Sequence, residues 1–133
     1  MDSFEFRVPI RVDDTFARRP PRQTVLVVTA DDALREAAAR VVMSAGYRVV
    51  TAAHSGHAVL ACLTEGPIDV VAVDLAMDDT SGPALAERLR RHQPALLSMY
   101  FAARGTPASD GVLVRPFTSD DLVERIEALV ALV

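Results

Sequence analysis

Short apolar runs alternate with amphipathic segments along residues 24–133 of the chain. A continuous apolar run that is bounded by turn residues is typical of a strand buried on both faces, as in a parallel sheet. The clearest example is VVAV at 70–73, which meets Asp74 and then a polar loop ending in Ser81 and Gly82. The runs that predict strands are residues 24–29, 47–52, 70–74, 97–101 and 112–114.

Apolar residues at helical spacing separate these runs. Asp31 or Asp32 can cap a helix that stops at Gly46, and residues 55–64 form a shorter one. Ser81 caps a helix with Pro83 in its first turn, which extends to about residue 92. A capping-box-like start at residues 118–121 opens a last helix with a buried stripe. The order predicts an α/β fold, with helices on both faces of a five-stranded, doubly wound parallel sheet.

Residues 1–23 read as an N-terminal arm and linker, and residues 24–133 as the domain. Apolar residues alternate with polar ones or proline in the arm, which is the periodicity of a strand. The alternating positions are Phe4, Phe6, Val8, Ile10 and Val12. The basic, proline-containing stretch at 18–22 is typical of a solvated linker. Three interpretations stay open: an added edge strand, a segment exchanged in a homodimer, and a mobile extension.

Composition excludes several classes of protein. The net charge of −4 argues against nucleic acid as the main partner, and no apolar run is long enough to cross a bilayer. The N-terminus lacks the basic start and apolar core of a secretory signal, so the expected location is cytoplasmic. The single Cys62 lies in an apolar run and is expected in the core.

Asp74 is the leading candidate for chemistry, because open α/β sheets place their sites beyond the carboxyl ends of the strands. The alternative interpretation is a turn residue whose side chain bonds nearby amides. His54 and His57 lack the further ligands of a metal site and are expected to be exposed loop residues. No phosphate-binding glycine loop or nucleophile elbow is present in the sequence.

From residue 24 onward the chain resembles the receiver domain of bacterial response regulators in two-component signalling. The resemblance rests on the order and spacing of four pieces, VLVV with ALREAAARVV, AGYRVVTAAHSGHAVL, IDVVAVDLAMDDTSG and VLVRPF. It implies a flavodoxin-like sheet and a strand-end aspartate, here Asp74, that accepts a phosphoryl group from a histidine kinase.

The resemblance also implies an acidic pair after the first strand, which binds Mg²⁺. That pair falls on Thr29 and Ala30, neither of which has a carboxylate. Asp31 lies one residue beyond this pair and is expected to cap the helix instead, although a bulge in the chain could move its carboxylate into the metal-binding position. Asp78 and Asp79 are candidate compensating acids. We expect Mg²⁺ to bind weakly or not at all.

Further departures affect the switch that the resemblance implies. Ala102 stands in place of the hydroxyl that bonds the phosphoryl group, and Val112 in place of the aromatic residue that changes rotamer. The connection from Ala102 to Arg115 is too short for the usual fourth helix, so we expect that helix to be shortened or missing. Arg115 replaces a lysine and is expected to pair with Asp74 or a phosphate, across a cis bond to Pro116.

The sequence therefore favours an atypical receiver domain that acts by protein–protein interaction, independently of phosphorylation, with no enzymatic activity and no cofactor. The expected partner is a signalling protein, either a histidine kinase or an output protein. One alternative is a phosphorelay receiver that is phosphorylated on Asp74. A second is a flavodoxin-like domain that binds a small molecule, which fold alone does not exclude.

Overall fold

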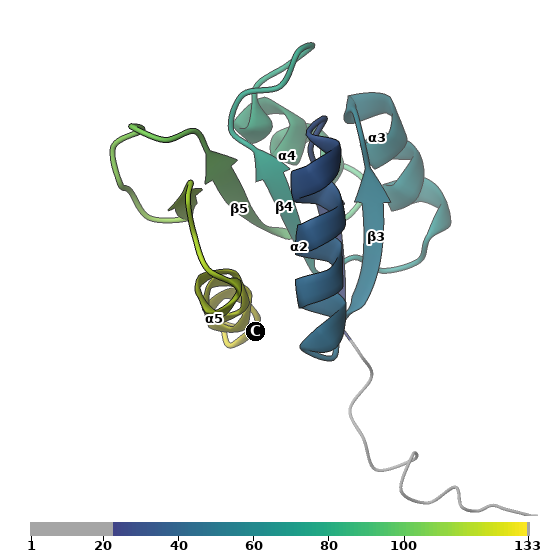
Figure 1. The fold of residues 1–133 in the computed structure, drawn as a ribbon. Helices are drawn as coiled ribbons and strands as arrows, with labels where there is room; N and C mark the ends of the chain where they lie inside the picture. Colours follow the sequence, from purple (N-terminus) through teal and green to yellow (C-terminus); the bar gives the residue numbers. More distant parts are fainter. Residues whose placement is uncertain (1–22, 133) are drawn as a thin grey trace, which may run out of the picture.

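A computed structural model describes residues 23–132 and shows one parallel sheet with helices on both faces (Figure 1). The sheet has five strands in the order β3-β2-β4-β5-β6, and each neighbouring pair is parallel. The strands are β2 (Thr24–Val28), β3 (Arg48–Ala52), β4 (Val70–Asp74), β5 (Leu97–Ala102) and β6 (Val112–Val114). The predicted five-stranded, doubly wound fold is confirmed.

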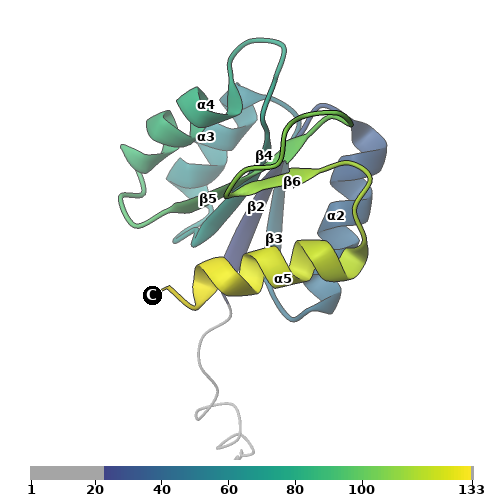
Figure 2. The same ribbon diagram turned by 90° about the vertical axis from the view of Figure 1, so that its left-hand side faces the viewer.

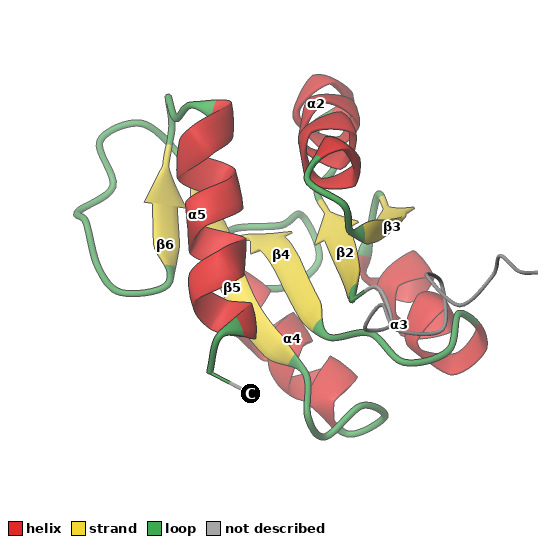
Figure 3. Cartoon of the chain, turned by 90° about the horizontal axis from the view of Figure 1, so that it is seen from below, coloured by secondary structure: helices red, strands yellow, loops and turns green. Residues whose placement is uncertain are grey.

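Helices cover both faces of the sheet (Figures 2 and 3). The helices α2 (Asp32–Ser44) and α5 (Ser119–Val130) pack on one face, and α3 (Ser55–Thr64) and α4 (Gly82–Arg90) on the other. The strands β2 and β4 lie between both layers, so their apolar residues are buried from either side. This explains why these two runs are continuously apolar rather than alternating.

Side chains at the helix starts fix where each helix begins. Asp31, His54, Ser81 and Thr118 are the N-cap residues, and Thr118 forms a full capping box with Asp121. Each cap satisfies a backbone N–H that has no partner inside the helix. Several predicted boundaries differ by one or two residues: β2 ends at Val28, β3 starts at Arg48, α4 ends at Arg90 and β5 ends at Ala102.

No helix lies between β5 and β6, as the short connection predicted. Residues 103–111 form an irregular loop in which Gly105 and Gly111 have positive φ values of 91° and 78°. Those conformations are open to glycine at little cost and turn the chain back to the sheet. The loop therefore replaces a helical layer beside β5 and β6.

The strand order places a topological switch point between β2 and β4. From β2 the chain moves outward to β3, and after α3 it returns to the other side of β2. The two connections diverge at the carboxyl ends of β2 and β4 and leave a crevice there, which is where ligands bind in open α/β sheets. Thr29 follows β2 and Asp74 ends β4 at this point.

Candidate functional site

Asp74 meets the buried hydroxyl of Thr29 across the switch point. The Thr29 Oγ1 donates a hydrogen bond to Asp74 Oδ2. Thr29 is completely buried, and its backbone N–H donates to the carbonyl of Ala52 over 3.1 Å. The hydroxyl is therefore held on the sheet, at one of the positions where the resemblance implies a metal-binding carboxylate.

The second oxygen of Asp74 is paired with Arg115. Arg115 Nη2 lies 2.8 Å from Asp74 Oδ1, and Nη1 lies 3.2 Å from Asp31 Oδ2. The backbone of Arg115 is fixed at the end of β6, because its N–H donates to Ala102 over 3.0 Å. The guanidinium thus bridges acids that follow two different strands. The predicted pairing of Arg115 with Asp74 and the cis bond to Pro116 are both present.

Asp31 joins this network and also caps α2, as predicted. Its Oδ1 accepts the N–H of Leu34 over 3.1 Å, and its own N–H donates to Thr29 Oγ1 over 3.1 Å. The hydrogen bond from Leu34 lowers the pKa of Asp31 more than partial loss of solvent raises it, and the charge of Arg115 lowers that pKa further. Asp31 is therefore held in its charged form by a helix start and a cation.

A lowered pKa in the folded state makes the contribution of Asp31 to stability depend on pH. That contribution is present above the unfolded-state pKa of about 4 and is lost as the pH falls through the lower folded value. We expect Asp31→Asn, which keeps a cap but not the charge, to be less stable than the wild type at pH 7, with the difference shrinking toward pH 2. Urea denaturation across this range measures it. A difference that is constant with pH would contradict the assignment.

The other predicted acids, Asp78 and Asp79, follow Asp74 in the loop before α4. Asp79 accepts a hydrogen bond from the hydroxyl of Ser55 at the start of α3, and Asp78 is exposed. Both belong to a loop that an isolated bridge between Ala76 and Ser81 closes. Ala30 is exposed and contributes no ligand. Asp79 is therefore tied to the start of α3.

Two histidines were predicted in a loop, and that interpretation was wrong for one of them. His54 caps α3, but His57 belongs to the first turn of that helix. Their rings lie 3.9 Å apart, and both side chains are exposed. The pair borders the helix start and takes no part in the contacts of Asp74.

The donor set around Asp74 does not fit Mg²⁺. Among residues 23–132, no three His, Cys, Asp or Glu side chains come together as a metal cluster. Mg²⁺ requires hard oxygen ligands in near-octahedral geometry. Here a guanidinium lies between Asp31 and Asp74, where a metal would have to share those carboxylates. The positive charge beside these two carboxylates in the structure is the guanidinium of Arg115.

Gly82 is a site residue that sequence reasoning missed, since it was read only as the start of a helix. A Cβ at this position would overlap the carbonyl oxygen of Asp74 and lie 3.1 Å from its carbonyl carbon. The N–H of Gly82 also donates to the carbonyl of Leu75 over 2.8 Å. Glycine therefore allows α4 to start directly against the backbone that carries Asp74.

We expect Gly82→Ala to lower the free energy of unfolding by about 1–3 kcal/mol, the range for an added group in a packed site. The backbone of Asp74 must move to admit the methyl group, so amide shifts should change at Asp74 and Arg115 as well. Gly66→Ala is the control. A Cβ at position 66 meets nothing within 4 Å, so this variant adds backbone strain at a positive φ of 79° but no steric overlap. Equal spectra around Asp74 in both variants would contradict this role of Gly82.

A cavity of about 230 Å³ opens above Asp74 and Arg115. Ala102 lines it where the resemblance implies a hydroxyl, and Val112 is buried on the neighbouring strand. Thr106 of the 103–111 loop lines the same cavity, which sequence alignment did not suggest because Thr106 is four residues past Ala102. The full lining is Asp74, Leu75, Ala76, Phe101, Ala102, Ala103, Thr106 and Arg115.

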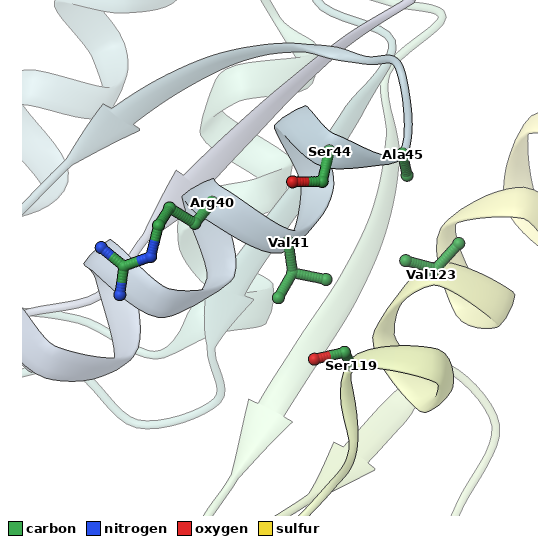
Figure 4. Close-up of a pocket in the computed structure, with 6 residues that line it drawn as sticks. All are labelled: Arg40, Val41, Ser44, Ala45, Ser119 and Val123. Atoms are coloured by element: carbon green, nitrogen blue, oxygen red, sulfur yellow. The ribbon is translucent and has the colours of Figure 1, made fainter.

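A second hollow of about 490 Å³ lies between α2 and α5 (Figure 4). Val41 of α2 and Val123 of α5 form its apolar part, and the side chain of Arg40, which also lines it, extends away from α5. It shares no lining residue with the cavity above Asp74. It contains none of the candidate site residues.

A family model, the response regulator receiver domain, matches residues 25–127. The chain belongs to this family. Its receiver fold, a flavodoxin-like sheet, is shared with solved receiver structures. The receiver domain of the hybrid histidine kinase CckA superposes with a TM-score of 0.69 at 28% identity, over 80% of this chain and 97% of that one. A putative response regulator from Chloroflexus aurantiacus J-10-fl gives 0.72 at 26% identity, over 84% and 99%.

Two curated relatives carry such a segment within longer proteins. The sensor kinase CckA of Brucella abortus is 32% identical over 80% of this chain, which corresponds to 12% of its own length. The probable transcriptional regulatory protein TcrX of Mycobacterium tuberculosis is 29% identical over 80% of this chain and 49% of its own length. The chain thus spans half or less of these relatives, so their wider activities do not transfer to it. No helix among the described residues is long and apolar enough to cross a membrane.

Proposed function

We propose that this receiver acts as a protein–protein interaction module in signal transduction and that it works without phosphorylation. The observation that carries the proposal is the state of Asp74. One carboxylate oxygen accepts a hydrogen bond from Thr29, and the other is paired with Arg115 at 2.8 Å. The negative charge of the side chain that would accept a phosphoryl group is therefore already paired with a cation within the fold.

This arrangement opposes phosphoryl transfer in two ways. Attack on a phosphoryl group uses a lone pair of a carboxylate oxygen, and each oxygen of Asp74 already accepts a hydrogen bond, which lowers its nucleophilicity. The transfer also needs a metal ion to offset the charge that the phosphoryl oxygens carry. Among the described residues, no three His, Cys, Asp or Glu side chains are close enough together to hold a metal ion. The guanidinium of Arg115 already contacts both Asp74 and Asp31. On this proposal the domain is not an enzyme and takes no cofactor.

The switch positions support the same proposal. A ligand shifts a conformational equilibrium only through contacts that differ between the two states. Ala102 offers no hydroxyl for a phosphoryl group to attract, and the buried Val112 offers no ring to reposition. Both residues belong to paired strands, β5 and β6, and the helix that could move between them is missing.

The partner in this proposal is a signalling protein, either a histidine kinase or an output protein. Support comes from the relatives, which are named as a sensor kinase and a transcriptional regulatory protein.

One observation favours a second function, a phosphorelay receiver that is phosphorylated on Asp74. Thr106 lines the same cavity as Asp74 and Arg115 and brings a hydroxyl to it from the loop rather than from β5. If Arg115 released Asp74 and bound the phosphoryl oxygens instead, Thr106 would be the available hydroxyl. The two functions differ in whether Asp74 reacts at all.

The test uses the full chain with a small acyl phosphate donor and Mg²⁺, and follows intact mass and amide spectra. We expect no added phosphoryl mass and no change of the spectrum around Asp74. In cells, Asp74→Asn should leave signalling unchanged, because the amide oxygen of asparagine can still accept a hydrogen bond from Arg115 while its NH2 group donates one to the hydroxyl of Thr29. Asp110→Asn, an exposed change in the 103–111 loop, is the matched control. Loss of signalling in Asp74→Asn alone, with the fold intact, would replace this proposal by the phosphorelay.

A further inference from the structure

The outer edge of β3 is open within the described part of the chain. This strand lies at one end of the sheet and pairs only with β2 (Figure 3). Arg48 donates its N–H to Gln23 over 2.9 Å, and Ala52 accepts the N–H of Thr29. Because backbone groups of alternate residues point to opposite sides of a strand, Val49 and Thr51 direct theirs away from β2. An edge of this kind is a template for another strand.

The opposite edge of the sheet has a cover of its own. On β6, the N–H of Val112 donates to the carbonyl of Ser109 over 3.2 Å. The carbonyl of Val112 accepts from Arg125 Nη1 over 3.0 Å. A loop and a helix side chain therefore occupy the outward groups at the start of this three-residue strand. Of the two edges, β3 is the longer one and the one that a further strand can reach.

A hollow of about 700 Å³ borders the open edge on the side of α2. Thr51 of β3 forms one wall, and the flank of α2 forms the other. That flank has the small side chains of Ala33 and Ala39 at its centre and the charged Asp32, Arg35 and Glu36 around them, so an entering apolar side chain would meet the alanines and the aliphatic parts of the charged residues. Val49 faces the same side, because it packs with the cluster that α2 covers. Apolar side chains of a strand added beside β3 would enter this space.

The N-terminal arm, which lies outside the described residues, supplies a segment whose sequence has the matching pattern. We propose that residues 4–12 of the same chain add to the sheet as a strand antiparallel to β3. If Phe6, Val8 and Ile10 pair with Val49 and Thr51, all their side chains point toward the hollow beside α2. Pro9 then falls at a position whose missing N–H would face solvent, which is where an edge strand tolerates proline.

The connection has the right place and length. Gln23 lies beside Arg48, at the end where β3 begins, so a strand that runs toward Gln23 is antiparallel to β3 with the shortest return. The distance to bridge is two strand spacings, about 10 Å, while ten residues (13–22) extend to about 33 Å. Arginine and proline in this connection suit a solvated crossing.

Hydrogen exchange of the full chain tests this inference. In the wild type, the amides of Val49 and Thr51 should be protected, with Val50 as the internal reference because its backbone groups face β2 in either case. Val8→Pro removes an N–H that faces β3 and should speed exchange at Val49 and Thr51 about tenfold or more. Arg7→Pro, the matched control, removes an outward N–H and should leave both protected.

Each other outcome overturns the inference. Rapid exchange of Val49 and Thr51 in the wild type would mean that the edge stays open. Protection that disappears on dilution would assign the added strand to a second copy of the chain. Equal loss in Val8→Pro and Arg7→Pro would contradict the proposed pairing. Effects of Val8→Pro at Val41 and Val123, with β3 unaffected, would place the arm between α2 and α5.

Discussion

Replacing Arg115 by methionine is expected to lower the free energy of unfolding at pH 7 by about 1–2 kcal/mol. That value lies between the small contribution of an exposed ion pair and the large cost of breaking a buried one. The side chain of Asp74 is only 15% exposed, whereas that of Arg115 is 34% exposed. The variant keeps the aliphatic bulk but leaves the carboxylates of Asp74 and Asp31 facing each other without a cation.

A double-mutant cycle with Asp74→Asn separates this pairing from general effects of the substitution. We expect a coupling energy between positions 115 and 74, measured by urea denaturation of the wild type, both single variants and the double variant. Arg90→Met is the control, because Arg90 pairs with Glu87 within one helix turn at 2.7 Å and such pairs contribute about 0.2–0.5 kcal/mol. Additive effects of Arg115→Met and Asp74→Asn would contradict the bridge.

Most of the fold followed from local patterns in the sequence. The continuous apolar runs at residues 24–28 and 70–73 marked strands buried on both faces, because only such strands need no polar side. Ser81 with Pro83 marked the start of α4, since these residue types suit the first positions of a helix. Boundaries such as the end of α4 were less certain, because helix ends depend on packing as well as propensity.

The candidate site was predictable in part, because some of its contacts are set by strand order. Asp74 ends β4 and Arg115 follows β6, on either side of β5, and their pairing was predicted from the resemblance to receiver domains. The contact of Thr29 with Asp74 joins residues 45 positions apart and depends on a side-chain rotamer. Thr106 reaches the cavity through a loop whose path no periodicity describes.

Asp31 shows how one residue can have two roles that the sequence presents as alternatives. Its cap position follows from the helix pattern, and its contact with Arg115 follows only from the three-dimensional path of β6. Gly82 is a similar case, because the close approach of its backbone to Asp74 is invisible until α4 is placed against β4. Tertiary proximity, rather than local propensity, decides such roles.

The second large effect is expected when carboxylates are introduced at positions 29 and 30, where the resemblance to receiver domains implies a metal-binding acidic pair. In the wild type, Mg²⁺ titration should leave the amides around Asp74 without saturation at low-millimolar metal, and the melting temperature should not change. In the variant Thr29→Asp with Ala30→Asp, two carboxylates would join Asp74 at the switch point. Three acids with one guanidinium provide the hard oxygen ligands that Mg²⁺ prefers.

This double variant should also show a linked change in stability. Without metal, a carboxylate at the completely buried position 29 lies against Asp74, and the like charges should destabilise the fold. Mg²⁺ that binds only the folded state should then recover stability as its concentration rises. Adding Asp74→Asn removes one ligand and is expected to weaken this recovery. Saturable Mg²⁺ binding at Asp74 in the wild type would show that Thr29 and Arg115 do not block the site, and the phosphorylation-independent function would lose its physical basis.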